Sequence, residues 1–237
     1  MRNTTGNRRS AAATWVVPLL AGLGLIALAA PRLGAAVAAL DGSSLIQGQG
    51  GQGSQGSHAD LVAAAAGLET AFAWVADGEG EATRSALLMR AAVLAPDEEA
   101  RAQAHEAAEA AAVAALALAP AQPVTWARLA YLRERRLDRA GAAEALRQSF
   151  LSGPFLPSMM VQRMDLAVRL RDQMDDRTLA LFERQIRLTW VVSPRYVSGL
   201  WTDPALRPHV EAALGTVSEA EAQTYVRLRG GDAVFQP

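Results

Sequence analysis

Cysteine and lysine are both missing from this chain of 237 residues. Without cysteine the chain forms no disulfide, offers no thiolate nucleophile and builds no cysteine-ligated zinc site. Without lysine it has no phosphate-binding loop of the type that ends in Lys-Ser or Lys-Thr. Aromatic residues are scarce, at 5% of the chain, and the β-branched and aromatic runs that are typical of strands are rare.

Alanine supplies much of the hydrophobic content, which reaches 51% of the chain. Alanine is the best helix former and fills little space, so its excess favours closely packed helices over a sheet. The 23 basic and 24 acidic residues give a net charge of −1, which lacks the basic surplus of a nucleic-acid-binding protein. We therefore expect an all-α protein that does not bind nucleic acid.

Residues 11–30 form an apolar segment without any charged side chain. Their number is about the 20 residues that a helix needs to cross a bilayer. Arg2, Arg8 and Arg9 precede the segment and only Arg32 follows it closely, so the positive-inside rule places the N-terminus in the cytoplasm. We interpret residues 11–32 as a signal anchor, a single transmembrane helix in the inner (cell) membrane. Residues 1–10 would then be cytoplasmic and the main domain periplasmic or otherwise extracytoplasmic.

Two other interpretations of this segment stay open. A cleavable signal peptide also combines basic residues with an apolar stretch, and small-x-small sites occur at residues 27–29 and 36–38. The segment could also be a buried helix of a soluble domain. Either alternative would leave the mature protein without a membrane anchor.

Residues 33–58 read as a linker between the anchor and the rest of the chain. Their second half, 47–57, consists of glycine, glutamine and serine and has no apolar residue. Such a stretch cannot offset its ordering entropy by burying surface, so we expect a flexible tether. Its root-mean-square reach is roughly 18 Å, which would keep the following domain near the membrane.

The remaining chain is predicted to be a helical domain over residues 59–228, followed by a tail over 229–237. Prolines and capping residues divide it into helices, because proline stops a helix or occupies its first turn. The predicted helices cover residues 60–76, 82–94, 97–118, 123–135, 139–151, 156–172, 176–191, 204–214 and 218–228.

Pro120 and Pro154 lie 34 residues apart, which is the period of a tetratricopeptide repeat. Between them, Trp126, Leu129, Ala142, Leu146 and Pro154 occupy the Trp, Leu, Ala, large apolar and Pro positions of that family. The stretch thus resembles one tetratricopeptide repeat, with partial relatives on either side.

This resemblance implies a solenoid-like domain of stacked antiparallel helix pairs. It also implies a role in protein–protein interaction, of the kind found in cell-envelope assembly, secretion or polysaccharide export. Arg133 stands where the family has an aromatic residue, so a standard concave groove is not implied.

A dense charged turn contains Arg133, Arg135, Arg136 and Arg139. One interpretation is a solvated connection between two helices. The other is a contact for an acidic partner surface or for lipid head groups, because arginine pairs bidentately with carboxylate and phosphate.

Aromatic residues gather near the C-terminal end, where Trp190, Tyr196 and Trp201 surround Pro194. They either fill the space between long helices and a C-terminal helix pair or form an exposed hot spot for protein binding.

No pattern of catalytic residues stands out. The three histidines (His58, His105 and His209) are scattered, and no serine lies in a G-x-S-x-G elbow. We assign no catalytic, cofactor-binding or metal-binding residue, no cofactor and no small-molecule substrate.

The expected function is that of a non-catalytic, membrane-anchored scaffold that binds protein partners at the membrane and contacts lipid through its N-terminal helix. An accessory subunit of an integral membrane complex, and an enzyme with an unrecognised helical active site, are the alternatives.

Overall fold

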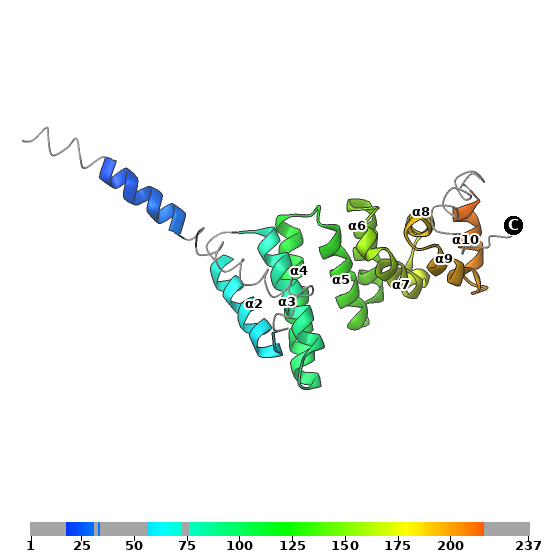
Figure 1. The fold of residues 1–237 in the computed structure, drawn as a ribbon, viewed down its shortest axis with the longest axis horizontal. Coiled ribbons are helices and arrows are strands. Elements are labelled where there is room, and N and C mark those ends of the chain that lie inside the picture. The colour runs from blue at the N-terminus through cyan, green and yellow to red at the C-terminus, as the bar shows by residue number, and fades with distance from the viewer. Residues whose placement is uncertain (1–17, 31–32, 34–55, 73–75, 216–237) are drawn as a thin grey trace, which may run out of the picture. The chain divides into compact units, whose positions relative to one another are not determined.

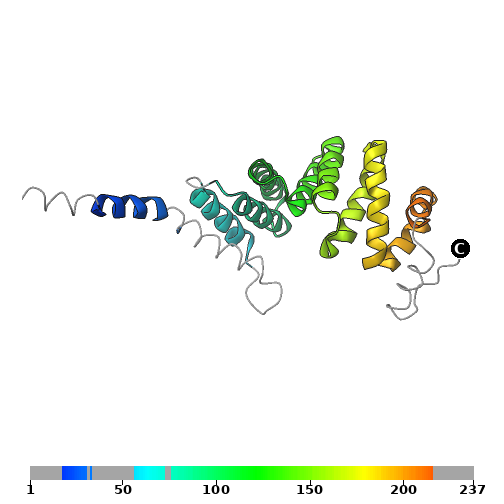
Figure 2. The same ribbon diagram turned by 90° about the horizontal axis from the view of Figure 1, so that it is seen from above.

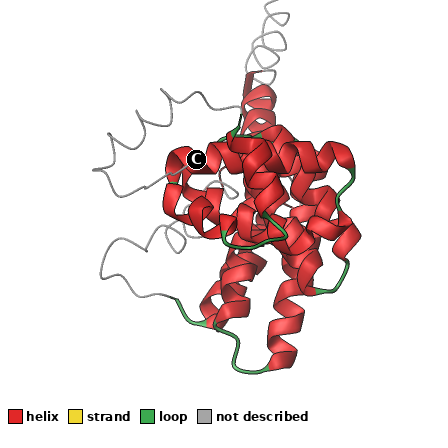
Figure 3. Cartoon of the chain, turned by 90° about the vertical axis from the view of Figure 1, so that its right-hand side faces the viewer, coloured by secondary structure: helices red, strands yellow, loops and turns green. Residues whose placement is uncertain are grey.

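The computed structural model describes residues 18–30, 33, 56–72 and 76–215. Every regular element within these ranges is helical, as Figure 3 shows, and no strand occurs in them. The prediction of an all-α protein is therefore confirmed for the described part of the chain. The chain divides into two compact units, Met1–Ala111 and Ala112–Pro237, so the predicted helical domain over 59–228 extends across both.

Residues 18–30 are helical, and their leucines have exposed fractions between 55% and 70%. Among the described residues, no helix combines the length and the apolar character needed to cross a membrane. The predicted anchor over 11–32 includes residues 11–17 and 31–32, which lie outside the described ranges, as does most of the predicted linker.

In the first unit, α2 (His58–Phe72) and α3 (Gly78–Val93) pack as an antiparallel pair (Figure 1). At one end of the pair, His58 Nδ1 lies 2.9 Å from the carbonyl oxygen of Ala91. At the other end, the ring of Phe72 lies against Gly80, where an added Cβ would come within 2.0 Å of the ring. Ser85 of α3 donates a 2.9 Å hydrogen bond from its hydroxyl to the Ala108 carbonyl of α4 (Glu98–Leu118).

The second unit begins within α4, because the boundary between the units falls after Ala111. Its further elements are α5 (Pro123–Arg135), α6 (Arg139–Ser152), η2 (Pro157–Met159), α7 (Met160–Leu170), η3 (Arg171–Gln173), α8 (Asp176–Val192), α9 (Pro194–Trp201) and α10 (Arg207–Leu214).

Helices α5 and α6 pack side by side as a hairpin (Figure 2). A hydrogen bond at each end shows that the two helices are antiparallel. Ser149, near the end of α6, donates a 2.7 Å bond to the carbonyl of Pro123 at the start of α5. Arg133, near the end of α5, donates a 3.2 Å bond to the carbonyl of Gly141 near the start of α6. Pro123 begins α5 as predicted, because its missing N–H needs no partner in the first turn.

Helix α8 packs against α7, α9 and α10, and together with α6 these helices enclose the core of the second unit. Its large side chains include Phe150, Met164, Phe182, Ile186 and Trp190. Asp175 caps α8, since its side chain accepts from the Thr178 N–H at 2.8 Å.

Several predicted helix boundaries are wrong near the C-terminal end. Residues 194–201 form α9, although we expected no helix there, because Pro194 occupies its first position and does not merely end α8. The helix predicted over 204–214 begins only at Arg207. A turn precedes it, in which Asp203 accepts a 2.8 Å hydrogen bond from the Ala205 N–H. The helix predicted over 156–172 is divided into η2, α7 and η3. The helix predicted over 218–228 lies outside the described residues.

Candidate functional site

The charged turn between α5 and α6 has the backbone geometry of a Schellman motif. The Leu137 N–H donates to the Glu134 carbonyl and the Asp138 N–H donates to the Arg133 carbonyl, both at 3.0 Å. These two bonds satisfy the Arg133 and Glu134 carbonyls near the end of α5. The motif requires a left-handed backbone at the first residue after the C-cap. Leu137 occupies that position with a φ of 65°. Asp138 then starts α6 by accepting from the Gly141 N–H at 2.9 Å.

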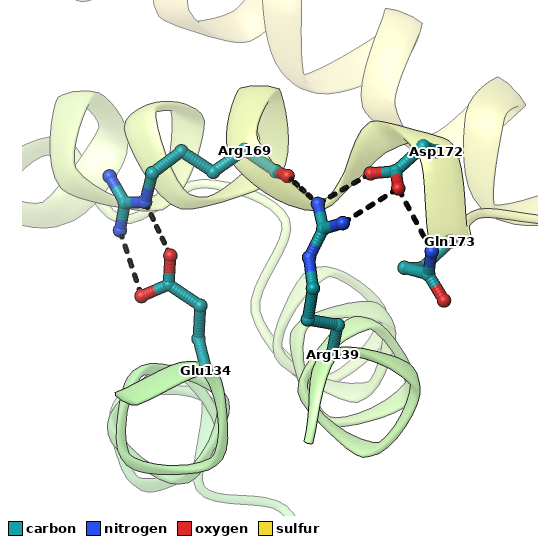
Figure 4. Close-up of polar contacts among 5 residues, drawn as sticks. All are labelled: Glu134, Arg139, Arg169, Asp172 and Gln173. Atoms are coloured by element: carbon teal, nitrogen blue, oxygen red, sulfur yellow. Dashed lines mark hydrogen bonds and ion pairs between the residues drawn. The ribbon is translucent and has the colours of Figure 1, made fainter. Parts of the chain in front are cut away.

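Two ion pairs join this turn to α7 and η3 (Figure 4). Glu134 Oε1 lies 2.7 Å from Arg169 Nε, and Arg139 Nη2 lies 2.6 Å from Asp172 Oδ1. Arg139 also donates to the Arg169 carbonyl at 2.5 Å. Hydrogen bonds from Gln173 and then from Arg139 lower the pKa of the Asp172 carboxyl, while the bond to Glu134 raises the pKa of Arg169. The turn is thus held at its base by oppositely charged neighbours.

The four arginines that we singled out in this turn differ in their surroundings. Arg133 donates to the Gly141 carbonyl and Arg139 bridges to Asp172, so both contribute to packing within the chain. Arg135 and Arg136 are exposed and directly precede Leu137. Only part of the turn therefore faces solvent.

Trp190, Tyr196 and Trp201, the predicted aromatic cluster, are distributed between core and surface. Trp190 is buried in the core, with an exposed fraction of 3%, while Tyr196 and Trp201 are partly buried against it. Tyr196 donates a 2.6 Å hydrogen bond from its hydroxyl to Asp165 Oδ1. Burial and this bond to a carboxylate both raise the pKa of Tyr196, so its hydroxyl stays protonated at neutral pH.

A groove of about 490 Å³ runs between α7 and α9. Its lining residues are Asp165, Val168, Arg169, Arg195, Tyr196, Gly199 and Leu200. The residues from α7 follow the spacing i, i+3, i+4, as do Tyr196, Gly199 and Leu200 of α9, so each helix turns one face toward the groove. Arg169 and Asp165 are both held by the contacts described above. The groove therefore combines apolar lining with polar groups whose positions are set.

The positions assigned to the repeat core lie mostly in the interior of the second unit. Leu129, Ala142 and Leu146 have exposed fractions of 2% or less. Trp126 is partly buried, and its indole donates to the Pro120 carbonyl at 2.8 Å. Pro154 follows α6, and its carbonyl accepts from Gln185 at 2.9 Å. Membership of the tetratricopeptide-repeat family stays a prediction.

Arg163 of α7 is a buried arginine with a structural role that we did not predict. Its side chain is only 1% exposed, and it donates to the carbonyl of Gly153 at 2.7 Å and to Gln185 Oε1 at 2.5 Å. Its guanidinium also lies over the ring of Phe150, 5.1 Å from the centroid. Burial lowers the pKa of Arg163 to about 10, which leaves it charged at neutral pH.

The sequence does contain a signal for this buried arginine. Met160, Arg163, Met164, Ala167 and Leu170 recur at helical spacing and all five are buried. An arginine inside such an apolar stripe has to find partners within the protein, since an unpaired buried charge is costly. The stripe could have been read from the sequence, but its partners could not.

The described residues contain no group of three or more histidine, aspartate and glutamate side chains placed to hold a metal ion. His209 Nδ1 lies 3.0 Å from Glu183 Oε1 and its ring meets Phe182 edge-on, so it joins α10 to α8. Compared with protein-family models, with curated proteins and with solved structures, the chain gives no match.

Proposed function

We propose that this chain is a non-catalytic interaction protein, anchored in a membrane by residues 11–32, whose helical region binds a partner protein outside the cytoplasm. The observation that carries the proposal is the groove between α7 and α9. The anchor and its direction rest on the apolar, uncharged segment and on the arginines that precede it. Tethering would raise the local concentration of the domain at the membrane and so strengthen a moderate affinity.

The groove suits an α-helix of the partner that is apolar along one face. Its two walls are helix faces, and ridges of a third helix can pack between such faces. Val168 and Leu200 offer apolar surface, while the Tyr196 ring is fixed by its bond to Asp165. A rigid aromatic side chain loses little entropy on binding and is a frequent hot spot.

Gly199 gives a direct way to test the groove. An added Cβ at this position would meet nothing within 4 Å, so Gly199→Leu should fill the groove without disturbing the fold. Leucine is also the better helix former. Gly67→Leu in α2 is the matched control, because that helical glycine has equally open surroundings.

The experiment uses the natural absence of cysteine to place one photocrosslinker. Full-length Arg195→Cys, labelled at the rim of the groove, is irradiated in isolated membranes. We expect a discrete crosslinked protein that disappears when Gly199→Leu is added and persists with Gly67→Leu. A crosslink pattern that Gly199→Leu leaves unchanged would contradict the role of the groove. Recovery of the chain in the soluble fraction would contradict the anchor.

A further inference from the structure

Leu137 at the tip of the α5–α6 hairpin is exceptional in two ways. It is the single non-glycine residue with a positive φ in the part of the chain that the structure describes. Its exposed fraction, 84%, is also the highest among the exposed large hydrophobic side chains of that part. The Schellman geometry demands a left-handed residue here, and glycine meets that demand without steric cost.

Leucine at this position is therefore unfavourable both for the backbone and for the side chain. Its Cβ crowds the following carbonyl in the left-handed region, and the side chain gains almost no burial in return. Strained residues cluster at functional positions. The Leu137 side chain, 84% exposed, is accessible to a contact from outside this chain.

Positive charge surrounds the leucine. Residues 133–139 contain four arginines and two carboxylates, a surplus of two positive charges. Glu134 is held by Arg169, and Asp138 caps α6. Arg135 and Arg136 are exposed beside the tip. The ion pairs of Figure 4 connect the base of the turn to α7 and η3.

We propose that the tip formed by Arg135, Arg136 and Leu137 inserts into the surface of an anionic membrane. Arginine binds lipid phosphate bidentately and basic side chains are attracted to an anionic leaflet. The leucine would then reach the boundary of the acyl chains, where apolar side chains of peripheral segments are buried. A convex tip with one apolar side chain needs no matching pocket, which favours a lipid surface over an acidic protein surface.

This contact rests in part on the proposed function, because one leucine and two arginines bind weakly unless the domain is already tethered near the bilayer. Tethering makes the contact effectively intramolecular. The tip would then orient the second unit at the membrane, while the groove between α7 and α9 stays a separate surface on other helices.

The test places an environment-sensitive fluorophore on full-length Leu137→Cys, which has no other cysteine. The protein is reconstituted in phosphatidylcholine vesicles with or without phosphatidylglycerol. We expect a blue-shifted emission, and quenching by lipid-attached quenchers, only with phosphatidylglycerol. Leu151→Cys is the control, because Leu151 lies at the opposite end of the same hairpin and is 50% exposed. Its label should report no difference between the two lipids.

Charge reversal of Arg135 and Arg136 to glutamate should abolish the shift at position 137. Equal emission in both vesicle types, or an equal shift at position 151, would overturn the proposal. A shift that occurs only in native membranes, and not in protein-free lipid, would overturn it in favour of a protein contact. Flotation with phosphatidylcholine vesicles separately reports the anchor, so failure of the anchor and failure of the tip are distinguished.

Discussion

At the scale of single residues, Arg163 shows how this fold accommodates a buried charge with carbonyl and amide oxygens. The carbonyls of Gly153 and Pro154 follow the end of α6, where the helix dipole is negative and backbone acceptors lack helical partners. Gln185 supplies a further acceptor from α8. One guanidinium thus closes the end of α6 and joins it to two neighbouring helices.

Replacing Arg163 with methionine should therefore destabilise the second unit by about 3 kcal/mol, because several buried acceptors would lose a charged donor. Arg163→Lys should also be destabilising, since an ammonium cannot reproduce the planar fork or the stacking on Phe150. Urea unfolding followed by tryptophan fluorescence measures both. A loss below about 1 kcal/mol for the methionine variant would mean that water replaces the guanidinium, contrary to the role assigned to it.

Leu137 leads to a prediction of the opposite sign. The left-handed conformation costs an L-residue roughly 1–2 kcal/mol, and glycine loses about 0.5–1 kcal/mol through its greater freedom in the unfolded chain. Leu137→Gly should thus stabilise the protein by up to about 1 kcal/mol, measured by the same unfolding experiment.

Leu137→Ala is the control for that variant. It removes the exposed side chain but keeps the strained backbone, so it should bring no comparable gain. Equal stabilisation by alanine and by glycine would show that the side chain, and not the φ of 65°, is the source of the cost.

At the scale of elements, the helix pairs depend on close contacts at a few positions. In the first unit, the Phe72 ring at the end of α2 fills the space where Gly80 of α3 has no side chain. Phe72 is 8% exposed and Gly80 is buried. A larger residue at position 80 would displace the Phe72 ring from its buried position.

Gly80→Ala should destabilise the first unit by about 1–3 kcal/mol, because its Cβ would overlap the Phe72 ring and displace it from its buried position. Gly67→Ala in α2 is the matched comparison, since its Cβ would meet no atom within 4 Å. That variant should stabilise by up to about 1 kcal/mol through helix propensity. Thermal unfolding monitored by circular dichroism checks both signs, and a neutral Gly80→Ala would contradict the close contact.

Helix boundaries were predictable where local chemistry sets them. Helix α5 has the predicted bounds because Pro123 suits a first turn and the chain leaves the helix after Arg135. Helix α9 was missed because Pro194 fits either the end of one helix or the first turn of the next. The choice depends on Val197, which is fully buried in the core of the second unit. Val197, Leu200 and Trp201 do recur at helical spacing, but which face of the segment is buried depends on helices that are distant in the sequence.

At the scale of the whole molecule, the chain consists of two compact units with their boundary inside α4. Gly80 lies in the first unit and Arg163 in the second. Gly80 meets Phe72, whereas Arg163 bonds to Gly153 and Gln185, so the two residues share no partner among these contacts. Mutational effects at sites without shared partners add to within about 0.3–0.5 kcal/mol. The double variant Gly80→Ala/Arg163→Met should therefore lose the sum of the two single losses.

Urea unfolding of the two single variants and the double variant tests this additivity. If the units unfold in separate transitions, each substitution should shift only the transition of its own unit. A deviation from the sum of more than about 1 kcal/mol would mean that the units are energetically coupled.

Some features of the candidate sites could be predicted from the local sequence, and others only from the tertiary structure. The arginines of the charged turn and the aromatic residues near Pro194 were recognised from their density along the chain. Which of them face solvent was not predictable, because Arg139 is engaged by Asp172 and Trp190 by the core only after distant helices meet. The residues that line the groove recur at helical spacing within α7 and within α9, but the sequence does not show that these two faces meet.

Composition and periodicity by themselves determined that this protein is helical and where most of its helices begin and end, because propensity, proline and capping act within a few residues. Tertiary structure alone decided that Arg163 is buried, that Tyr196 is held by Asp165 beside a groove, and that Leu137 is presented at an exposed tip. Arg163 and Tyr196 bond to partners about 10 and 30 residues away along the chain. Leu137 is exposed because no other helix of the described residues covers it. A side chain's neighbours along the chain do not fix what will pack against it.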